Sequence, residues 1–264
     1  MSLKEIQTYA ESFMNHSGHS FDHVLRVYNL CSKISKQSPD KIDTEVLLTS
    51  ALLHDIARDN ESKTGECHAS IGAKWAKKYL ESLNFNADKI EKIVYCIENH
   101  RHSKGIIPKT MEARILQEAD RLDATGAIGI IRTTSHNVLK KPYHLTDPLA
   151  KNREIDDYTY SLDHFLFKLL KLKDEITVPL LKKEATKRHE FMLKFLEKVN
   201  YELLNNSLKQ ATLLIELIRK NSDLKPYNLK DPFASKNTIV SKIMEHKELE
   251  FIQEFLDELK SEIL

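Results

Sequence analysis

The charge balance of this 264-residue chain excludes one broad class of function. Forty basic and 39 acidic residues give a formal net charge of +1, so no global positive field exists to attract a long nucleic acid. A hydrophobic fraction of 41% is typical of a globular protein, and no apolar stretch approaches membrane-spanning length. Three cysteines in no disulfide-like or metal-like spacing predict a cytoplasmic protein. Because no apolar stretch is long, we also expect no contact with a membrane.

Apolar residues recur at helical spacing, as in Val24, Leu25, Tyr28 and Cys31, and runs rich in Val, Ile and Thr are nearly absent. The chain also has only six glycines and seven prolines, so we predict an all-α fold. The predicted helices cover about residues 3–15, from Ser20 onward, from Asp43 or Thr44 to 57, 67–83, 88–100, from Thr110 onward, 158–172, 178–204 and 238–264.

Three segments between these helices are predicted to be loops. Arg58–Glu66 is polar and contains Gly65, and Arg101–Lys109 is basic and is closed by Pro108. Periodicity fades over Ser135–Asp157, and long weakly structured segments in a compact domain are often functional.

The most informative feature is the pair His54-Asp55, which follows the apolar run Leu47–Leu53. That run predicts a buried helix, and an unpaired carboxylate at its end would cost several kcal/mol or more to desolvate. A bound cation would remove this cost. His54 and Asp55 therefore predict a metal site if other ligands reach the same place.

Other predicted helical segments supply such ligands, namely His23, His100 and Asp120, with His68 as a further source. Imidazole and carboxylate together suit Mn, Fe, Zn, Ni or Co, and ligands from several helices build metal sites in helical bundles. Structural alternatives remain: a capping role for the His54-Asp55 pair, His19 in place of His23, and a backbone hydrogen bond for His68.

The sequence resembles the HD-domain phosphohydrolases, whose H…HD…D signature is matched by His23, His54-Asp55 and Asp120. The flanking residues match as well, in DHVLRV (22–27), ALLHDI (51–56) and EADRLDA (118–124). GAIG (126–129) and KRHEFM (187–192) are similar to a bacterial subgroup that contains nucleoside triphosphate pyrophosphohydrolases. The resemblance implies an HD-type domain over residues 1–205, with 206–264 as a C-terminal helical extension packed on or beside it.

The resemblance implies a divalent metal ion (Mn, Fe, Ni, Co, Zn or Mg) held by His23, His54, Asp55 and Asp120. Some relatives bind a second metal, and His68 and His100 are the candidates for that ion or for substrate, with Asp55 as the bridge. The metal would activate water and neutralise charge on the phosphoryl group.

Basic residues near this site are candidates for binding phosphate: Arg26, Arg58, Arg101, His102, Lys104 and Arg121, with Arg132 as a further one. A solvated surface is the alternative for the segment that follows His100. Some relatives have a Glu shortly after the HD pair, where this chain has Ile56-Ala57-Arg58-Asp59. Asp59 and Asp123 are therefore the candidates for a general acid or base.

The predicted function is hydrolysis of a nucleoside or deoxynucleoside triphosphate to the monophosphate and pyrophosphate. The alternatives are a nucleotide-binding regulator with little turnover, another phosphomonoesterase or phosphodiesterase, and an oxygenase with two irons. The expected partner is a small phosphate substrate, a nucleotide, and a homodimer stays an open alternative.

Overall fold

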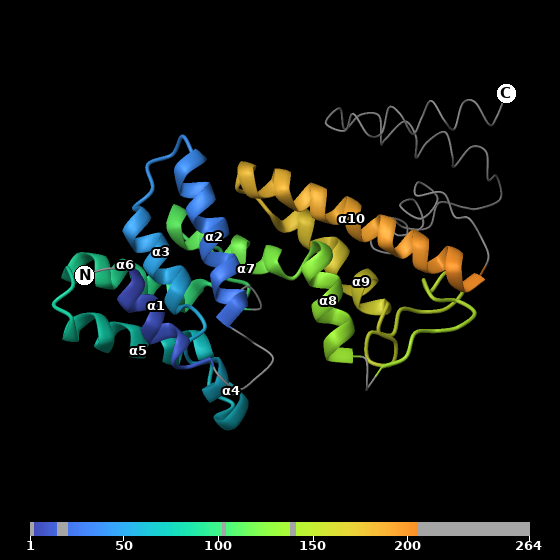
Figure 1. The fold of residues 1–264 in the computed structure, drawn as a ribbon, viewed down its shortest axis with the longest axis horizontal. Helices are drawn as coiled ribbons and strands as arrows, with labels where there is room; N and C mark the ends of the chain where they lie inside the picture. The colour runs from blue at the N-terminus through green and yellow to red at the C-terminus, as the bar shows by residue number, and fades with distance from the viewer. Residues whose placement is uncertain (1–2, 15–20, 102–103, 138–140, 205–264) are drawn as a thin grey trace. The chain divides into compact units, whose positions relative to one another are not determined.

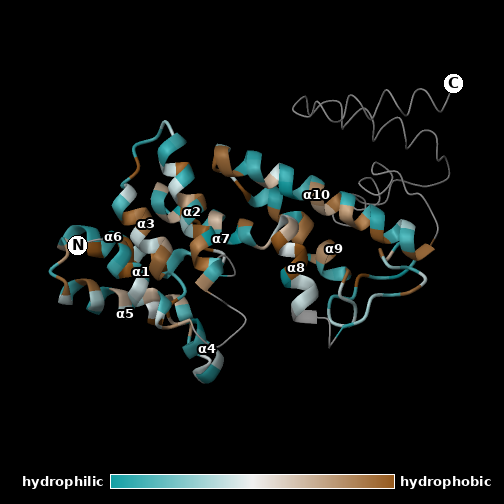
Figure 2. Cartoon of the chain, viewed as in Figure 1, coloured by the Kyte–Doolittle hydropathy of each residue, from teal (hydrophilic) through white to brown (hydrophobic). Residues whose placement is uncertain are grey.

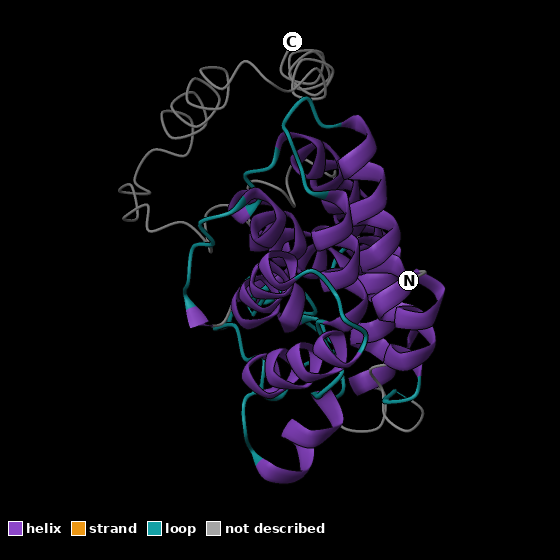
Figure 3. Cartoon of the chain, turned by 90° about the vertical axis from the view of Figure 1, so that its left-hand side faces the viewer, coloured by secondary structure: helices purple, strands orange, loops and turns teal. Residues whose placement is uncertain are grey.

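A computed structural model of the chain describes residues 3–14, 21–101, 104–137 and 141–204. Every regular element within these ranges is a helix, which confirms the predicted all-α class (Figure 3). The chain divides into two units, Met1–Leu196 and Glu197–Leu264. The predicted domain boundary after residue 205 and the predicted helix over 238–264 lie outside the described residues.

Figure 1 shows the helices along the chain. They are α1 (Leu3–Glu11), α2 (Phe21–Gln37), α3 (Thr44–Leu53), α4 (Arg58–Thr64), α5 (His68–Ser82), α6 (Ala87–Asn99), α7 (Met111–Asp123), α8 (Gly126–Asn137), α9 (Asp163–Phe167), the 3-10 helix η2 (Leu169–Glu175) and α10 (Pro179–Leu204).

Helix α3 is the centre of the first unit. It contacts α1, α2, α6 and α7, and every residue from Val46 to Leu53 is buried. A helix that is apolar on all sides is stable only when other helices surround it, and these four neighbours meet that requirement. Asp43 begins α3 as predicted, because its side chain accepts a hydrogen bond from the Val46 amide at 3.2 Å.

Helix α3 ends at Leu53, four residues before the predicted end at Ala57. The Ile56 amide donates to the Leu53 carbonyl at 3.4 Å, and the Arg58 amide donates to the Asp55 carbonyl at 2.9 Å. These bonds span three residues instead of four, so the chain tightens into turns directly after the buried helix. His54 and Asp55 therefore lie at the junction of α3 and α4.

The predicted loop over Arg58–Glu66 is wrong, because Arg58–Thr64 forms the short helix α4. Asp59 and Glu61 lie in its first turn, where acidic side chains favour a helix. Gly65 ends it with φ of +76°, donating its amide to the Glu61 carbonyl. No residue of α4 is buried, so hydrophobic periodicity could not reveal it.

Helix α7 packs against α2, α3 and α6, and Thr110 caps its first turn as predicted, accepting from the Ala113 amide at 3.2 Å. A sharp turn joins it to α8. Gly126 has φ of +71°, and a Cβ on Gly129 would lie 2.2 Å from the Ala124 carbonyl oxygen. Glycine at both positions therefore permits the sharp turn and the close approach of the two helices.

The predicted helix over 158–172 is partly wrong. The Asp156 carboxylate accepts from the Tyr158 and Thr159 amides at 3.0 Å each, and this turn occupies the predicted first helical turn. Helix α9 begins at Asp163, whose buried carboxylate accepts from both Nη atoms of Arg153, at 2.6 and 2.7 Å. The irregular segment before α9 is thus anchored by a buried ion pair.

Helix α10 was predicted over 178–204 and is observed from Pro179 to Leu204. Its buried apolar residues in the first unit recur at helical spacing, at Leu181, Ala185, Met192, Leu193 and Leu196. Figure 2 shows hydrophilic and hydrophobic residues alternating along this helix. Among the described helices, none combines the length and the apolar character that a membrane span requires.

Candidate metal centre

Six metal-type ligands from five helices meet at one end of the bundle around α3. His23 lies in the first turn of α2, His54 and Asp55 directly follow α3, and His68 is the first residue of α5. His100 directly follows α6, and Asp120 lies in the last turn of α7. All four imidazoles and Asp55 are at most 4% exposed. The structure therefore brings together every metal ligand that the sequence predicted.

The first group of ligands consists of His23, His54 and Asp120, whose donor atoms all lie within 4.8 Å of one another. His23 Nε2 lies 3.1 Å from Asp120 Oδ1 and 3.3 Å from His54 Nε2. The second group consists of Asp55, His68 and His100 under the same limit.

Asp55 faces both groups. Its Oδ1 lies 3.3 Å from His68 Nε2 and 3.6 Å from His100 Nε2. Its Oδ2 lies 3.7 Å from His23 Nε2 and 3.8 Å from His54 Nε2. A carboxylate with one oxygen toward each of two ligand groups is arranged to bridge two cations.

The imidazoles present lone pairs to this centre. Each Nδ1 meets an oxygen that can only accept: Asp123 Oδ2 for His23 at 2.7 Å, the Ala51 carbonyl for His54 at 2.8 Å, Glu61 Oε2 for His68 at 2.5 Å and the Ile97 carbonyl for His100 at 2.6 Å. In the neutral rings, a proton on each Nδ1 satisfies these acceptors and leaves the Nε2 lone pair facing the centre. Arg58 Nη1 also lies 2.8 Å from Nδ1 and 3.1 Å from Nε2 of His68. Four lone pairs and two carboxylates fit divalent cations, since they otherwise repel one another.

The pKa values of these groups follow from the same crowding. Burial would lower the pKa of His23, but hydrogen bonds to Asp120 and Asp123 raise it to about 9. Burial lowers the pKa of His54, and burial with the nearby Arg58 lowers the pKa of His68 to about 4. Burial would also lower the pKa of His100, but its hydrogen bond to Asp55 raises it. Without a cation, His23 and His100 are thus the imidazoles of the centre that bind a proton most readily.

We expect metal affinity to rise with pH. His23 binds a proton more tightly in the fold than in water, and a cation must displace that proton from Nε2. Below pH 9, the apparent affinity for Mn²⁺ should therefore rise at least about tenfold per pH unit, or at least about 100-fold between pH 6 and pH 8. Titration of the metal-free protein with Mn²⁺ in non-chelating buffers measures this slope. A chelator titrated at the same pH values corrects for hydroxide, and a flat profile contradicts the prediction.

Asp123 lies behind the first group, with 3% of its surface exposed. Besides His23, it accepts from Arg26 Nε at 2.7 Å, Arg26 Nη2 at 2.9 Å and Arg132 Nη1 at 2.8 Å. Burial would raise the pKa of Asp123, but its hydrogen bonds to His23 and Arg26 lower it. A carboxylate so engaged is arranged to hold its neighbours, and its role as an acid or base stays a prediction.

Glu61 lies behind the second group, and the sequence did not predict it as a site residue. Its carboxylate contacts His68 Nδ1, Arg58 Nη1 at 3.4 Å and Arg101 Nη1. It was missed because Arg58–Glu66 was predicted to be a loop, and a helix there brings Glu61 one turn after Arg58. The signal was the order of charges, with Asp59 and Glu61 in the first turn and Lys63 in the last, followed by Gly65.

The remaining candidates for phosphate binding and acid–base catalysis are Arg121, Lys104, Asp59 and His102. Arg121 Nη1 contacts the carbonyl of Glu175 at 3.0 Å and its carboxylate at 3.1 Å. Lys104 is exposed and donates to Ser70 Oγ at 3.3 Å, and Asp59 is half-buried on α4. His102 lies outside the described residues. The phosphate-binding and acid–base roles of these residues stay predictions.

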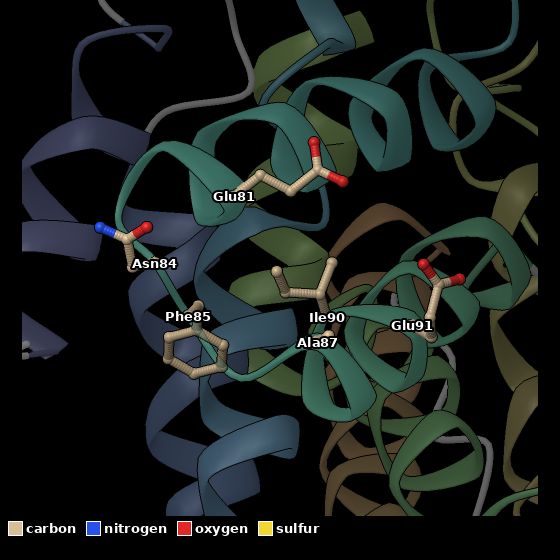
Figure 4. Close-up of a pocket in the computed structure, with 6 residues that line it drawn as sticks. All are labelled: Glu81, Asn84, Phe85, Ala87, Ile90 and Glu91. Atoms are coloured by element: carbon tan, nitrogen blue, oxygen red, sulfur yellow. The ribbon is translucent and has the colours of Figure 1, made fainter.

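An open pocket of about 340 Å³ at the turn between α5 and α6 shares no residue with this centre (Figure 4). It is lined by Glu81, Asn84, Phe85, Ala87, Ile90 and Glu91. Glu81 is 13 residues after His68 on α5, which corresponds to about 20 Å along the helix. The pocket is therefore separate from the candidate metal centre.

Comparison with known proteins identifies the family of this helical bundle. The family model for the HD domain matches residues 20–125, which contain all six candidate ligands. A solved HD-superfamily hydrolase from Bacillus thuringiensis is 32% identical, with a TM-score of 0.61 over 76% of this chain and 95% of that one. The chain therefore belongs to the HD superfamily of hydrolases.

Two further relatives are informative. The uncharacterized protein YpgQ of Bacillus subtilis is 29% identical over 209 residues, covering 76% of this chain and 93% of YpgQ. The crystal structure of YpgQ in complex with ADP covers 77% of this chain and 98% of that one, with a TM-score of 0.57 at 23% identity. Ribonuclease Y of Lawsonia intracellularis is 33% identical over 100 residues, 38% of this chain and 17% of that enzyme.

Proposed function

We propose that this protein is a metal-dependent phosphohydrolase that cleaves a nucleoside or deoxynucleoside triphosphate between the α and β phosphates. The products would be the nucleoside monophosphate and pyrophosphate. One observation carries the proposal: six candidate ligands in two groups face one another, and four arginines lie just outside them. These arginines are Arg26 of α2, Arg58 of α4, Arg101 after His100 and Arg132 of α8.

The ligand groups define where the metal would bind. His23, His54 and Asp120 would hold one ion, His68 and His100 would hold a second, and Asp55 would contact both. A bound divalent ion lowers the pKa of a coordinated water and stabilises charge on a phosphoryl oxygen. Mn²⁺ suits this set of imidazoles and carboxylates.

The arginines favour a polyanionic substrate. Arg26, Arg58, Arg101 and Arg132 each keep between 31% and 34% of their side chains exposed. Each guanidinium has five N–H donors, so one that contacts a carboxylate can still donate to phosphate oxygens. These charges support phosphoryl transfer over the oxygenase alternative, and the complex of YpgQ with ADP supports a nucleotide as the ligand.

A product assay tests the proposal. The purified full-length protein is incubated with Mn²⁺ and a panel of nucleoside and deoxynucleoside triphosphates, ADP, phosphomonoesters and short RNA. We expect monophosphate and pyrophosphate in equal amounts from the triphosphates. Release of orthophosphate, or cleavage of RNA alone, would favour the phosphomonoesterase or phosphodiesterase alternative.

The matched control is the Asp55→Ala protein, prepared in the same way. If the wild-type protein gives no more product than this control, the enzymatic proposal is wrong. Thermal stabilisation of the wild-type protein by a nucleotide without turnover would then support a regulator, because a ligand that binds the native state raises its stability.

A further inference from the structure

Two carboxylates that are not ligands each contact one histidine ligand at Nδ1. Asp123 contacts His23 of the first group at 2.7 Å, and Glu61 contacts His68 of the second group at 2.5 Å. The remaining histidines, His54 and His100, use backbone carbonyls three residues earlier in the chain. Each ligand group therefore has one imidazole fixed by its own helix and one fixed by a carboxylate from another helix.

Each of the two carboxylates also contacts two arginine side chains. Asp123 contacts Arg26 from α2 and Arg132 from α8. Glu61 contacts Arg58 from its own helix and Arg101, which follows His100. A single side chain thus fixes one metal ligand together with two guanidinium groups, once behind each ligand group.

We propose that Asp123 and Glu61 are positioning residues, each serving one metal subsite and the arginine pair beside it. The inference rests on the proposed function, since it assumes a cation in each group of ligands. Hydrogen bonds from a carboxylate to Nδ1 fix the ring orientation and raise the basicity of Nε2. The two subsites can therefore be weakened one at a time, by changing residues that are not themselves metal ligands.

Metal titration of the full-length protein tests this inference without any substrate. The metal-free protein is titrated with Mn²⁺ and free Mn²⁺ is measured by electron paramagnetic resonance. The wild-type protein should bind two ions per chain. Glu61→Gln should weaken one of them about 10- to 100-fold and leave the other unchanged, as is usual when a metal ligand loses its partner. Glu61→Asp should recover part of this loss, because the charge is retained.

The same replacements made in a His68→Ala protein show which of the two ions is weakened. In a His68→Ala protein, which lacks the imidazole that Glu61 contacts, adding Glu61→Gln should cause no further loss of Mn²⁺ affinity. Adding Asp123→Asn to the same protein should weaken the ion that remains. Glu81→Gln is the matched control, since Glu81 is exposed at the far end of α5.

Several outcomes overturn the inference. They are a wild-type protein that binds one ion, a Glu61→Gln effect that is equal on both ions, and a Glu61→Gln effect that persists when His68 is absent. If Asp123→Asn fails to fold, the Glu61 and His68 variants decide the matter alone, because Glu61 is 22% exposed on the surface helix α4. A wild-type protein that binds two ions but cleaves no triphosphate contradicts the proposed function and leaves this inference intact.

Discussion

Replacement of Asp55 by alanine should abolish hydrolysis, with a loss of at least about a thousandfold in kcat/KM. Asp55 is the ligand with one oxygen toward each group, so its removal weakens the binding of both cations. A metal contributes several kcal/mol of stabilisation to the transition state, and each 1.36 kcal/mol corresponds to about a tenfold change in rate. Steady-state kinetics at saturating Mn²⁺ measure the effect.

A thermal-shift experiment separates this loss from misfolding. Mn²⁺ at about 100 times its dissociation constant should stabilise the wild-type protein by about 2.7 kcal/mol, and the Asp55→Ala protein should gain much less. Asp88→Ala is the control, because Asp88 is an exposed carboxylate on α6. An Asp55→Ala protein that keeps both its activity and its metal-induced stabilisation would refute the bridging role.

The largest effect on stability is expected at Asp163, which is fully buried. Asp163→Ala removes the two hydrogen bonds that the Arg153 guanidinium donates to this carboxylate and the acceptor of the Asp156 amide at 2.6 Å. Breaking a buried ion pair from one side costs about 3–5 kcal/mol. The free energy of unfolding from urea denaturation should fall by this amount.

Two comparisons sharpen the test. Asp157→Ala removes the partner of His164 in a pair whose side chains are 24% and 27% exposed, so it should cost less than about 1 kcal/mol. The double replacement Arg153→Met with Asp163→Leu should cost less than Asp163→Ala alone, because it leaves no unpaired buried charge. An Asp163→Ala protein as stable as Asp157→Ala would contradict the anchoring role of the pair.

Features set by neighbouring residues were predictable from the sequence. Asp43 and Thr110 begin helices because an N-cap depends on the next three residues. The apolar run before His54 predicted a buried helix, since a helix without a polar face must be surrounded. The ligand set followed from the resemblance, which places His23, His54, Asp55 and Asp120 in register with a known signature.

Other features were not predictable, either because they depend on distant residues or because the local pattern gave no signal or a misleading one. Asp123 meets His23 across 100 residues of chain, and that contact depends on how α2 packs on α7. Glu61 escaped notice because its helix has no buried residue and so no hydrophobic period. The helix predicted over 158–172 failed because Asp156 captures backbone amides that a helix would have used.

Helices α3 and α4 differ in how readily we expect them to open. Every residue from Val46 to Leu53 at the end of α3 is buried, so its amides should exchange with solvent only when the bundle unfolds. Helix α4 has no buried residue and packs on α5, so its amides should exchange faster. His54 and Asp55 therefore lie on the side of the centre that opens last, and Arg58 and Glu61 lie on the side that opens first.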